Sequence, residues 1–301
     1  MALGYEGDLY ILAFDHRGSF QKKFFGIDGG AGPEDTLKII DAKTVIFEGL
    51  RRALADGVSN EAAGVLVDEQ FGAEVARAAT RDGLKLAMPA EKSGQHEFDF
   101  EYGEEFSAHI EAFDPAFTKV LVRYNPEGDG AMNARQAVRL KQLSDWLHHT
   151  GRRFLFELLV PAEPHQLETV ANDVGRFDRE VRPHLMRVAI AELQATGVEP
   201  DIWKIEGIDD PEQCREVAEQ CRIGGRDGVA CIVLGRGADD SAVDTWLRAA
   251  RGVPGYQGFA IGRSIWWNPL KFFVDGALPR EEAVSQIANN YRRFVAVWEQ
   301  G

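Results

Sequence analysis

The sequence predicts an α/β protein that folds as a single (βα)8 TIM barrel over residues 1–301. Short apolar runs rich in β-branched residues alternate with longer amphipathic segments from one end of the chain to the other. This alternation repeats eight times, and no linker or low-complexity tract interrupts it. A doubly wound open sheet is the alternative, but its dinucleotide-binding form is disfavoured because no GxGxxG motif follows the first strand.

Eight segments have the length and composition of buried parallel strands. In chain order they are residues 9–14, 64–68, 84–88, 118–124, 153–159, 201–206, 229–235 and 258–262. The strands of a TIM barrel present their carboxyl ends at one face, where the active site lies. Ionisable residues at those ends are therefore the first candidates for a functional site.

Helices are expected between the strands and after the last one. The predicted helical segments are residues 33–56, 71–82, 133–151, 181–197, 210–225, 239–252, 264–276 and 279–300. Pro33 and the pair Asp210-Pro211 are typical of helix starts, and Gly151 and Gly224 are typical of positions just after a helix end. These residues set the boundaries of the repeated units.

The composition excludes several classes of partner. The chain has 34 Lys and Arg against 48 Asp and Glu, so its formal net charge is −14. This charge disfavours a nucleic-acid-binding surface or an anionic-membrane surface. The N-terminal segment reaches acidic residues too early for a signal peptide, and no apolar run is long enough to span a bilayer. We expect a cytoplasmic protein without a membrane partner.

The cysteines and the C-terminal aromatic residues give weaker indications. Cys214, Cys221 and Cys231 are odd in number and lack a metal-type CxxC spacing, which favours reduced thiols. The aromatic-rich segment after residue 264 is expected to pack against the barrel as outer helices. A subunit contact in a homo-oligomer is the alternative for the same residues.

Charged residues stand in or directly after four predicted strands. Lys204 lies between apolar residues in DIWKIEG, Glu157 lies in RFLFELL, Lys119 lies in TKVLVRY, and Asp15 follows LYILAF. A single buried lysine or glutamate is usually part of a structural ion pair, and Lys204 alone could be a strand-end lysine that reaches solvent. Asp15 alone could cap the turn that follows its strand. In a barrel, however, all four converge in one cavity. There Lys119 is expected to lower the pKa of Lys204, which makes it an amine nucleophile, while Glu157 transfers protons.

The segments after the last two strands indicate a phosphate site. LGRGADD and AIGRSIWW each place a Gly-Arg pair before a predicted helix, where many TIM barrels bind phosphate. Gly262, Arg263 and Ser264 form the stronger candidate, and Gly235 with Arg236 forms the second. A glycine turn beside a surface arginine is the alternative reading of both.

Metal chemistry is disfavoured by the positions of the histidines. The seven histidines include no pair with metal-ligand spacing on one strand or helix, so we expect no metal and no other cofactor. Lys92, in MPAEKSG after the third strand, is a further amine next to Glu91. Its polar, loop-like surroundings favour contact with substrate over a nucleophilic role.

These motifs in this order resemble the class I tagatose 1,6-bisphosphate aldolase group over nearly the full length of the chain. The motifs are AFDHRGS, MPAEKSG, TKVLVRY, FLFELLVP, DIWKIEG and AIGRSIWW. The chain is most similar to the aldolase-like domain that is often fused to the sugar kinase of bacterial inositol catabolism. The resemblance implies a lysine Schiff base on Lys204, proton transfer by Glu157, support from Asp15 and Lys119, and phosphate binding by Arg263.

Two departures bear on the substrate. His16 stands where the tagatose enzymes have glutamine, and GRGAD replaces their serine-rich turn after the seventh strand. The second phosphate of a bisphosphate substrate is therefore in doubt. The inositol-type resemblance implies 2-deoxy-5-keto-gluconate 6-phosphate, which is cleaved to dihydroxyacetone phosphate and malonate semialdehyde. Arg17, Lys92 and Arg123 are the candidate cations for its acid end.

The expected activity is retro-aldol cleavage of a small sugar phosphate through a Schiff base on Lys204. Tagatose 1,6-bisphosphate and a sulfofructose phosphate remain alternative substrates. Two other functions stay open: a non-catalytic sugar-phosphate sensor, and an isomerase or epimerase that uses Glu157 as its base. Release of dihydroxyacetone phosphate from a panel of ketose phosphates would separate the three.

Overall fold

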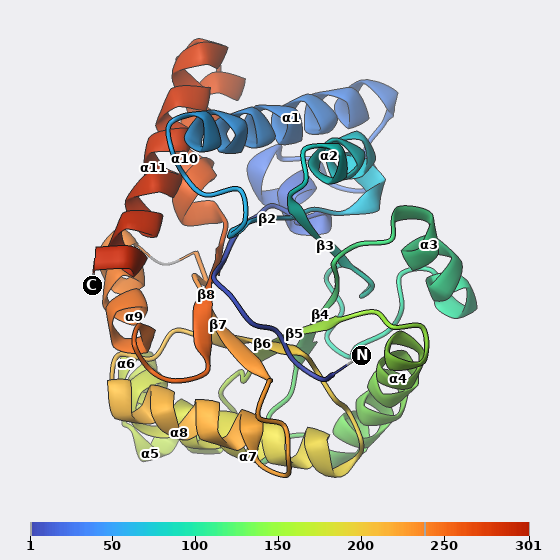
Figure 1. The fold of residues 1–301 in the computed structure, drawn as a ribbon, viewed down its shortest axis with the longest axis vertical. Coiled ribbons are helices and arrows are strands. Elements are labelled where there is room, and N and C mark those ends of the chain that lie inside the picture. The colour runs from blue at the N-terminus through green and yellow to red at the C-terminus, as the bar shows by residue number, and fades with distance from the viewer. Residues whose placement is uncertain (1, 238, 301) are drawn as a thin grey trace.

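The computed structural model describes residues 2–237 and 239–300 and shows a closed barrel of parallel strands ordered β1 to β8 (Figure 1). Each strand pairs in parallel with the next, and β8 pairs with β1 to close the sheet. The helices surround the strands on the outside (Figure 1). The predicted fold class, a (βα)8 TIM barrel, is therefore confirmed.

All eight strands lie within three residues of their predicted positions at either end. They are β1 (Leu9–Ala13), β2 (Ala63–Leu66), β3 (Lys85–Pro89), β4 (Phe117–Arg123), β5 (Phe154–Leu159), β6 (Ile202–Glu206), β7 (Ala230–Leu234) and β8 (Tyr256–Ile261). Most of their residues are buried on both faces, as expected of a parallel sheet covered by helices.

The long helices also follow the predicted order. They are α1 (Pro33–Ala55), α2 (Glu69–Arg81), α4 (Gly130–His149), α7 (Arg182–Ala195), α8 (Pro211–Arg222), α9 (Asp240–Ala250), α10 (Arg263–Val274) and α11 (Arg280–Gln300). Pro33 begins α1, and Asp210 caps α8 by accepting from the backbone N–H of Glu212. Gly151 and Gly224 adopt positive φ after α4 and α8.

Several shorter elements were not predicted. They are η1 (Phe20–Phe24), η2 (Gly103–Glu105), α3 (Phe106–Phe113), α5 (Pro164–Thr169), α6 (Val174–Arg176) and η3 (Phe177–Val181). The longest of them, α3, has no side-chain cap at its N-terminus, so it lacks the usual signal of a helix start. η1 and η3 are π-helical turns, which have no strong sequence signature.

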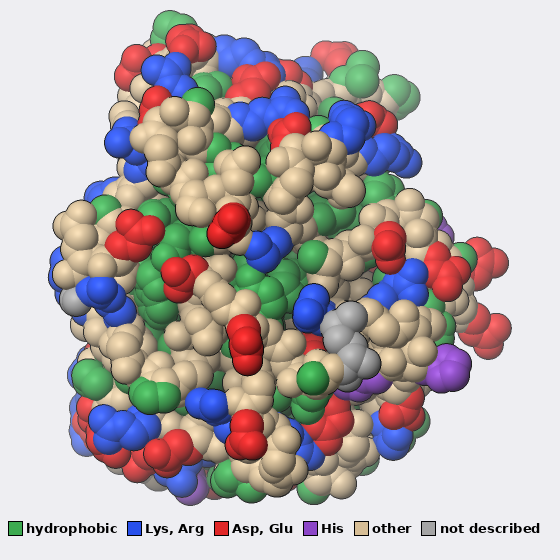
Figure 2. Space-filling model, in the orientation of Figure 1, with side chains coloured by type: hydrophobic (Ala, Val, Ile, Leu, Met, Phe, Trp, Pro, Cys, Tyr) green, Lys and Arg blue, Asp and Glu red, His purple; other side chains and the backbone are tan. Residues whose placement is uncertain are grey.

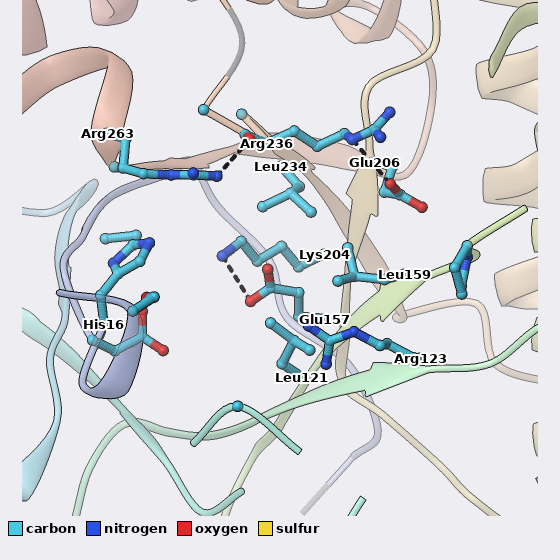
Figure 3. Close-up of a pocket in the computed structure, with 18 of the residues that line it drawn as sticks. His16, Leu121, Arg123, Glu157, Leu159, Lys204, Glu206, Leu234, Arg236 and Arg263 are labelled. Carbon is cyan, nitrogen blue, oxygen red and sulfur yellow. Dashed lines mark hydrogen bonds and ion pairs between the residues drawn. The ribbon is translucent and has the colours of Figure 1, made fainter. Parts of the chain in front are cut away.

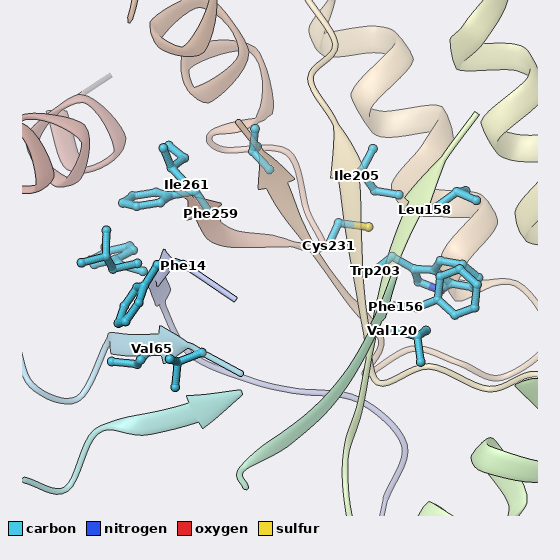
Figure 4. Close-up of a cluster of buried hydrophobic side chains, with 14 of the residues drawn as sticks. Phe14, Val65, Val120, Phe156, Leu158, Trp203, Ile205, Cys231, Phe259 and Ile261 are labelled. Carbon is cyan, nitrogen blue, oxygen red and sulfur yellow. The ribbon is translucent and has the colours of Figure 1, made fainter. Parts of the chain in front are cut away.

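Apolar side chains form two layers, one inside the barrel and one outside it. The inner layer fills the floor of the barrel with residues such as Leu9, Phe117, Leu155 and Ile202. The outer layer lies between the sheet and the helices, and Figure 4 shows part of it, including Phe156 and Trp203 with ring centroids 4.8 Å apart. Because the inner floor stops partway up the barrel, the carboxyl ends of the strands stay free for polar residues.

The C-terminal helices complete this outer layer. Trp266, Tyr291, Phe294 and Trp298 are buried against the barrel, as predicted, whereas Phe272 is 53% exposed. Across the described residues, no helix combines the length and apolar character needed to cross a membrane. Basic and acidic side chains are interspersed on the face seen in Figure 2.

Candidate active site

A cavity of about 490 Å³ opens at the carboxyl ends of the strands. Its wall is built by β1, β4, β5, β6, β7 and β8, together with the segments that follow them and the segment after β3 (Figure 3). This is the end of the barrel at which TIM-barrel enzymes carry out their chemistry. Of the residues predicted to act in catalysis or to bind substrate, all except Ser264 line the cavity.

Lys204, Glu157 and Lys119 form a buried charged layer directly above the apolar floor. Because side chains alternate along a strand, each points inward two residues after an apolar floor residue: Ile202, Leu155 and Phe117. Glu157 Oε2 lies 3.0 Å from Lys204 Nζ and 3.2 Å from Lys119 Nζ (Figure 3 shows the first pair). A single carboxylate oxygen therefore connects the two lysines.

Lys119 also holds two further carboxylates. Its Nζ donates to Asp15 Oδ2 at 2.8 Å and to Glu91 Oε1 at 2.7 Å. Burial alone would lower the pKa of Lys119, but the three carboxylates around it raise that pKa above its usual range. Lys119 thus keeps its proton and serves as the fixed positive centre of the layer.

The carboxyl groups around Lys119 have different proton affinities. Burial opposes ionisation of Asp15 and Glu157, but Lys119 holds the pKa of each below its usual value, and Lys204 adds to the effect. Burial raises the pKa of Glu91, and Lys119 and Arg17 only partly offset this rise. The layer therefore contains two ionised carboxylates and one that takes up a proton more readily.

The end of the cavity formed by the loops after β7 and β8 is rich in glycine. Gly235, Gly237, Gly262 and Arg263 line it. A Cβ on Gly262 would lie 2.2 Å from the carbonyl oxygen of Ala13, so only glycine fits between α10 and β1. Arg263 is the first residue of α10, and its Nη2 donates to the carbonyl oxygen of Arg236 at 2.6 Å. An arginine at a helix N-terminus is well placed to bind an anion.

The chain matches the model of a family described as an uncharacterized protein conserved in bacteria (DUF2090) over residues 4–301. The chain belongs to the DUF2090 family. A comparison with curated proteins finds no match.

Solved structures with the same fold include several aldolases. An archaeal fructose 1,6-bisphosphate aldolase aligns over 98% of this chain and 95% of its own, with 14% identity and a TM-score of 0.60. The fructose-bisphosphate aldolase of Slackia heliotrinireducens aligns over 98% and 86%, with 14% identity and a TM-score of 0.57. An archaeal fructose-1,6-bisphosphate aldolase whose catalytic Lys is covalently bound to the carbinolamine intermediate aligns over 97% and 94%, with 13% identity and a TM-score of 0.57. At this identity the likeness establishes a shared fold.

Within this DUF2090 chain, two predicted anion-binding arginines are held by carboxylates. Arg236 Nη1 lies 2.9 Å from Asp178 Oδ2 and its Nε lies 3.1 Å from Glu206 Oε1. Its guanidinium is thus paired with two carboxylates, and its backbone carbonyl accepts from Arg263; phosphate binding by Arg236 stays a prediction. The sequence pattern missed these pairs because Asp178 lies on η3, far from Arg236 in the sequence.

Arg17 is the second arginine that is paired with a carboxylate. It is buried, with Nη1 2.7 Å from Glu101 Oε2 and Nη2 donating to the carbonyl oxygen of Glu91 at 2.7 Å. These contacts tie Arg17 to the segment after β3, and its contact with the acid end of a substrate stays a prediction. Lys92 and Arg123 remain at the cavity wall, with Lys92 exposed and Arg123 donating to the carbonyl oxygen of Gln95 at 2.8 Å.

Glu91 and His16 are among the cavity-lining residues to which the sequence assigned no role. Glu91 follows β3 much as Asp15 follows β1, a parallel that the sequence alone could have suggested. Burial lowers the pKa of His16 to about 4, and its Nδ1 has no hydrogen-bond partner among the described residues. No group of three His, Cys, Asp or Glu side chains in the described chain is arranged as a metal site.

Proposed function

We propose that this protein is a class I aldolase that cleaves a ketose phosphate through a Schiff base on Lys204. The observation that carries the proposal is a buried lysine on β6 whose Nζ lies 3.0 Å from the Glu157 carboxylate, inside a cavity at the carboxyl ends of the strands. A lysine amine needs a base to take its proton before it can attack a carbonyl, and Glu157 is within reach to accept it.

The reaction then follows from the positions of these groups. Lys204 attacks the ketone, and Glu157 returns a proton to the hydroxyl of the carbinolamine, so that water leaves and an iminium ion forms. The iminium withdraws electrons from the neighbouring C–C bond, which breaks to give an aldehyde and an enamine. Protonation of the enamine and hydrolysis of the imine release the ketone product and restore Lys204.

The charge of the cavity favours an anionic substrate even though the chain as a whole is acidic. Nine basic and five acidic residues line the cavity, an excess of four formal positive charges, whereas the whole chain carries −14. Such a local excess concentrates anions where the surrounding surface would repel them. In this proposal Arg263 and the backbone around Gly262 and Gly237 hold the phosphate.

Similarity to aldolases supports this proposal. The structures of similar fold include fructose-bisphosphate aldolases, and one of them has its catalytic Lys covalently bound to the carbinolamine intermediate. We further propose 2-deoxy-5-keto-gluconate 6-phosphate as the substrate, with dihydroxyacetone phosphate and malonate semialdehyde as products. Lys92 and Arg123 would contact the acid end. Tagatose 1,6-bisphosphate and a sulfofructose phosphate are the competing substrates.

Borohydride reduction in the presence of dihydroxyacetone phosphate tests the proposal directly. We expect a covalent adduct, which peptide mass spectrometry locates on Lys204. Lys204→Ala and Lys204→Arg should both lose the adduct and the cleavage activity, since a guanidinium does not form an imine. Lys141→Arg, an exposed change on α4, should keep both. An adduct on another residue would contradict the role of Lys204. Binding of phosphate esters without any turnover would contradict the proposal and favour a sensor.

A further inference from the structure

Glu91 is a buried carboxyl group in the cavity wall for which the steps above have no role. It is 7% exposed, and its Oε1 accepts from Lys119 Nζ at 2.7 Å. Its Oε2 is buried and has no hydrogen-bond partner among the described residues. A buried polar atom without a partner is costly, and in a cavity wall it indicates a group that a bound ligand satisfies.

The structure fixes the backbone of Glu91 on both sides. Glu91 pairs with Phe100 in an isolated antiparallel bridge, and its carbonyl oxygen accepts from Arg17 Nη2 at 2.7 Å. Arg17 is in turn held by Glu101, whose Oε2 also accepts from the backbone N–H of Ser93 at 3.0 Å. The bridge to Phe100, Arg17 and Lys119 therefore orient a carboxyl whose second oxygen has no partner among the described residues, an arrangement that suits a reacting group better than a structural ion pair.

The other two carboxylates of the layer are already engaged. Glu157 Oε2 is shared by Lys119 and Lys204 and is reserved for proton transfer at the nitrogen of Lys204. Asp15 accepts from Lys119 and, like Glu157, is held in its ionised form. Glu91 takes up a proton more readily than either, because burial and the neighbouring Asp15 outweigh its cationic partners.

We infer that Glu91 is the general acid–base group for the substrate hydroxyl whose oxygen becomes the aldehyde, a role separate from that of Glu157. This inference rests on the proposed function. During cleavage, Oε2 of ionised Glu91 takes the hydroxyl proton, the O–H electrons form the aldehyde carbonyl, and the electrons of the C–C bond pass into the iminium to give the enamine. After the aldehyde leaves, Glu91 passes its proton to water and the enamine carbon gains one from water, so the proton count balances. In the condensation direction the protonated Glu91 donates to the developing alkoxide.

Glu91→Gln separates this role from a structural one. Glutamine keeps an oxygen that can accept from Lys119, but it does not exchange a proton. We expect cleavage of whichever ketose phosphate the wild type turns over to fall by about 10²–10⁴-fold. Borohydride trapping of dihydroxyacetone phosphate on Lys204 should be unchanged, because imine formation uses Glu157. In the pH profile of kcat/KM, the limb that reports ionisation of Glu91 should disappear in the variant. Glu97→Gln, the same change in the same segment but outside the cavity, should behave as wild type.

Two results would overturn the inference. Wild-type cleavage by Glu91→Gln would show that the carboxyl is not needed for proton transfer. Loss of imine trapping together with cleavage would show that Glu91 merely holds Lys119. Failure of the proposed function itself is distinct, because it would appear as the absence of a trapped adduct in the wild-type protein.

Discussion

Lys119 determines the protonation of the site because three carboxylates surround one ammonium group that is almost fully buried. It is 1% exposed and lies within 3.2 Å of oxygens of Asp15, Glu91 and Glu157. Removal of one partner from such a buried cluster leaves an uncompensated charge, which is far more costly than loss of a surface ion pair. The charged layer therefore acts as a unit.

His16, the residue after Asp15, should make the stability of the fold depend on pH. Burial lowers the pKa of His16 to about 4 from 6.5. Between these two pH values the unfolded chain binds a proton at His16 and the folded chain does not, so stability is lost as pH falls through this window. Because His16 as a whole residue is only partly buried, we expect a loss on the order of 2 kcal/mol.

His16→Gln should remove this pH-dependent contribution to the free energy of unfolding. The measurement is the free energy of unfolding of the wild type and of His16→Gln at pH 7 and at pH 4.5. The free energy of unfolding of the wild type relative to the variant should be smaller at pH 4.5 than at pH 7. His149→Gln, an exposed change on α4, should keep the wild-type dependence. Parallel pH curves for the wild type and His16→Gln would contradict the prediction.

At the scale of elements, a buried lysine on α1 fixes the end of β1 that carries Asp15 and His16. Lys43 is fully buried, and its Nζ donates to the carbonyl oxygens of Phe14 at 2.6 Å and His16 at 3.1 Å. It also pairs with buried Asp68, which caps α2 by accepting from the backbone N–H of Phe71. One side chain thus connects α1, the loop after β1 and the start of α2.

Lys43→Met should destabilise the fold by about 3–5 kcal/mol, because it leaves the Asp68 charge and two carbonyl groups buried without a donor. Urea unfolding measures this loss. Adding Asp68→Asn to Lys43→Met should restore part of it, since the buried charge is then removed. Lys38→Met on the same helix is the control, because Lys38 is exposed and its pairs with Glu34 and Asp35 are exposed as well. A loss no larger than that of the control would refute this role.

At the scale of the whole molecule, the amino end of the barrel is closed by the N-terminal segment. Tyr5 packs edge-on against Phe117 with ring centroids 5.3 Å apart, and its backbone N–H donates to the carbonyl oxygen of Gly228. Asp201 is 2% exposed and accepts from the backbone N–H groups of Gly4 at 2.8 Å and Phe154 at 2.7 Å. These contacts join the first residues of the chain to its middle.

Asp201→Asn is expected to weaken this closure by roughly 1–3 kcal/mol. An asparagine side chain has one acceptor oxygen, so one of the two buried N–H groups would lose its partner. Thermal unfolding should show a lower midpoint than for the wild type. Asp28→Asn, at a carboxyl that is 85% exposed, should leave the midpoint unchanged. An unchanged midpoint for Asp201→Asn as well would refute the assigned role.

The sequence by itself determined the order of the strands and the convergence of the charged layer. Lys119, Glu157 and Lys204 stand out locally as charged residues within apolar strand segments, and the count of eight βα units predicted that they converge in one cavity. Closure of the barrel then follows from the repeated βα units. The helix-start residues Pro33 and Asp210 also act locally, and both helices begin where these residues predict.

Only the tertiary structure decided which charges are paired with one another. Arg236 carries the same Gly-Arg signal as Arg263, but only the fold shows that Asp178 and Glu206 lie beside it, and that Glu101 lies beside Arg17, across distances that no local pattern encodes. The position of Glu91 after β3 is visible in the sequence, but only the packed structure shows its contact with Lys119 and its unpartnered Oε2. Burial and the charges of spatial neighbours set proton affinity, and both depend on the packed fold and not on position along the chain.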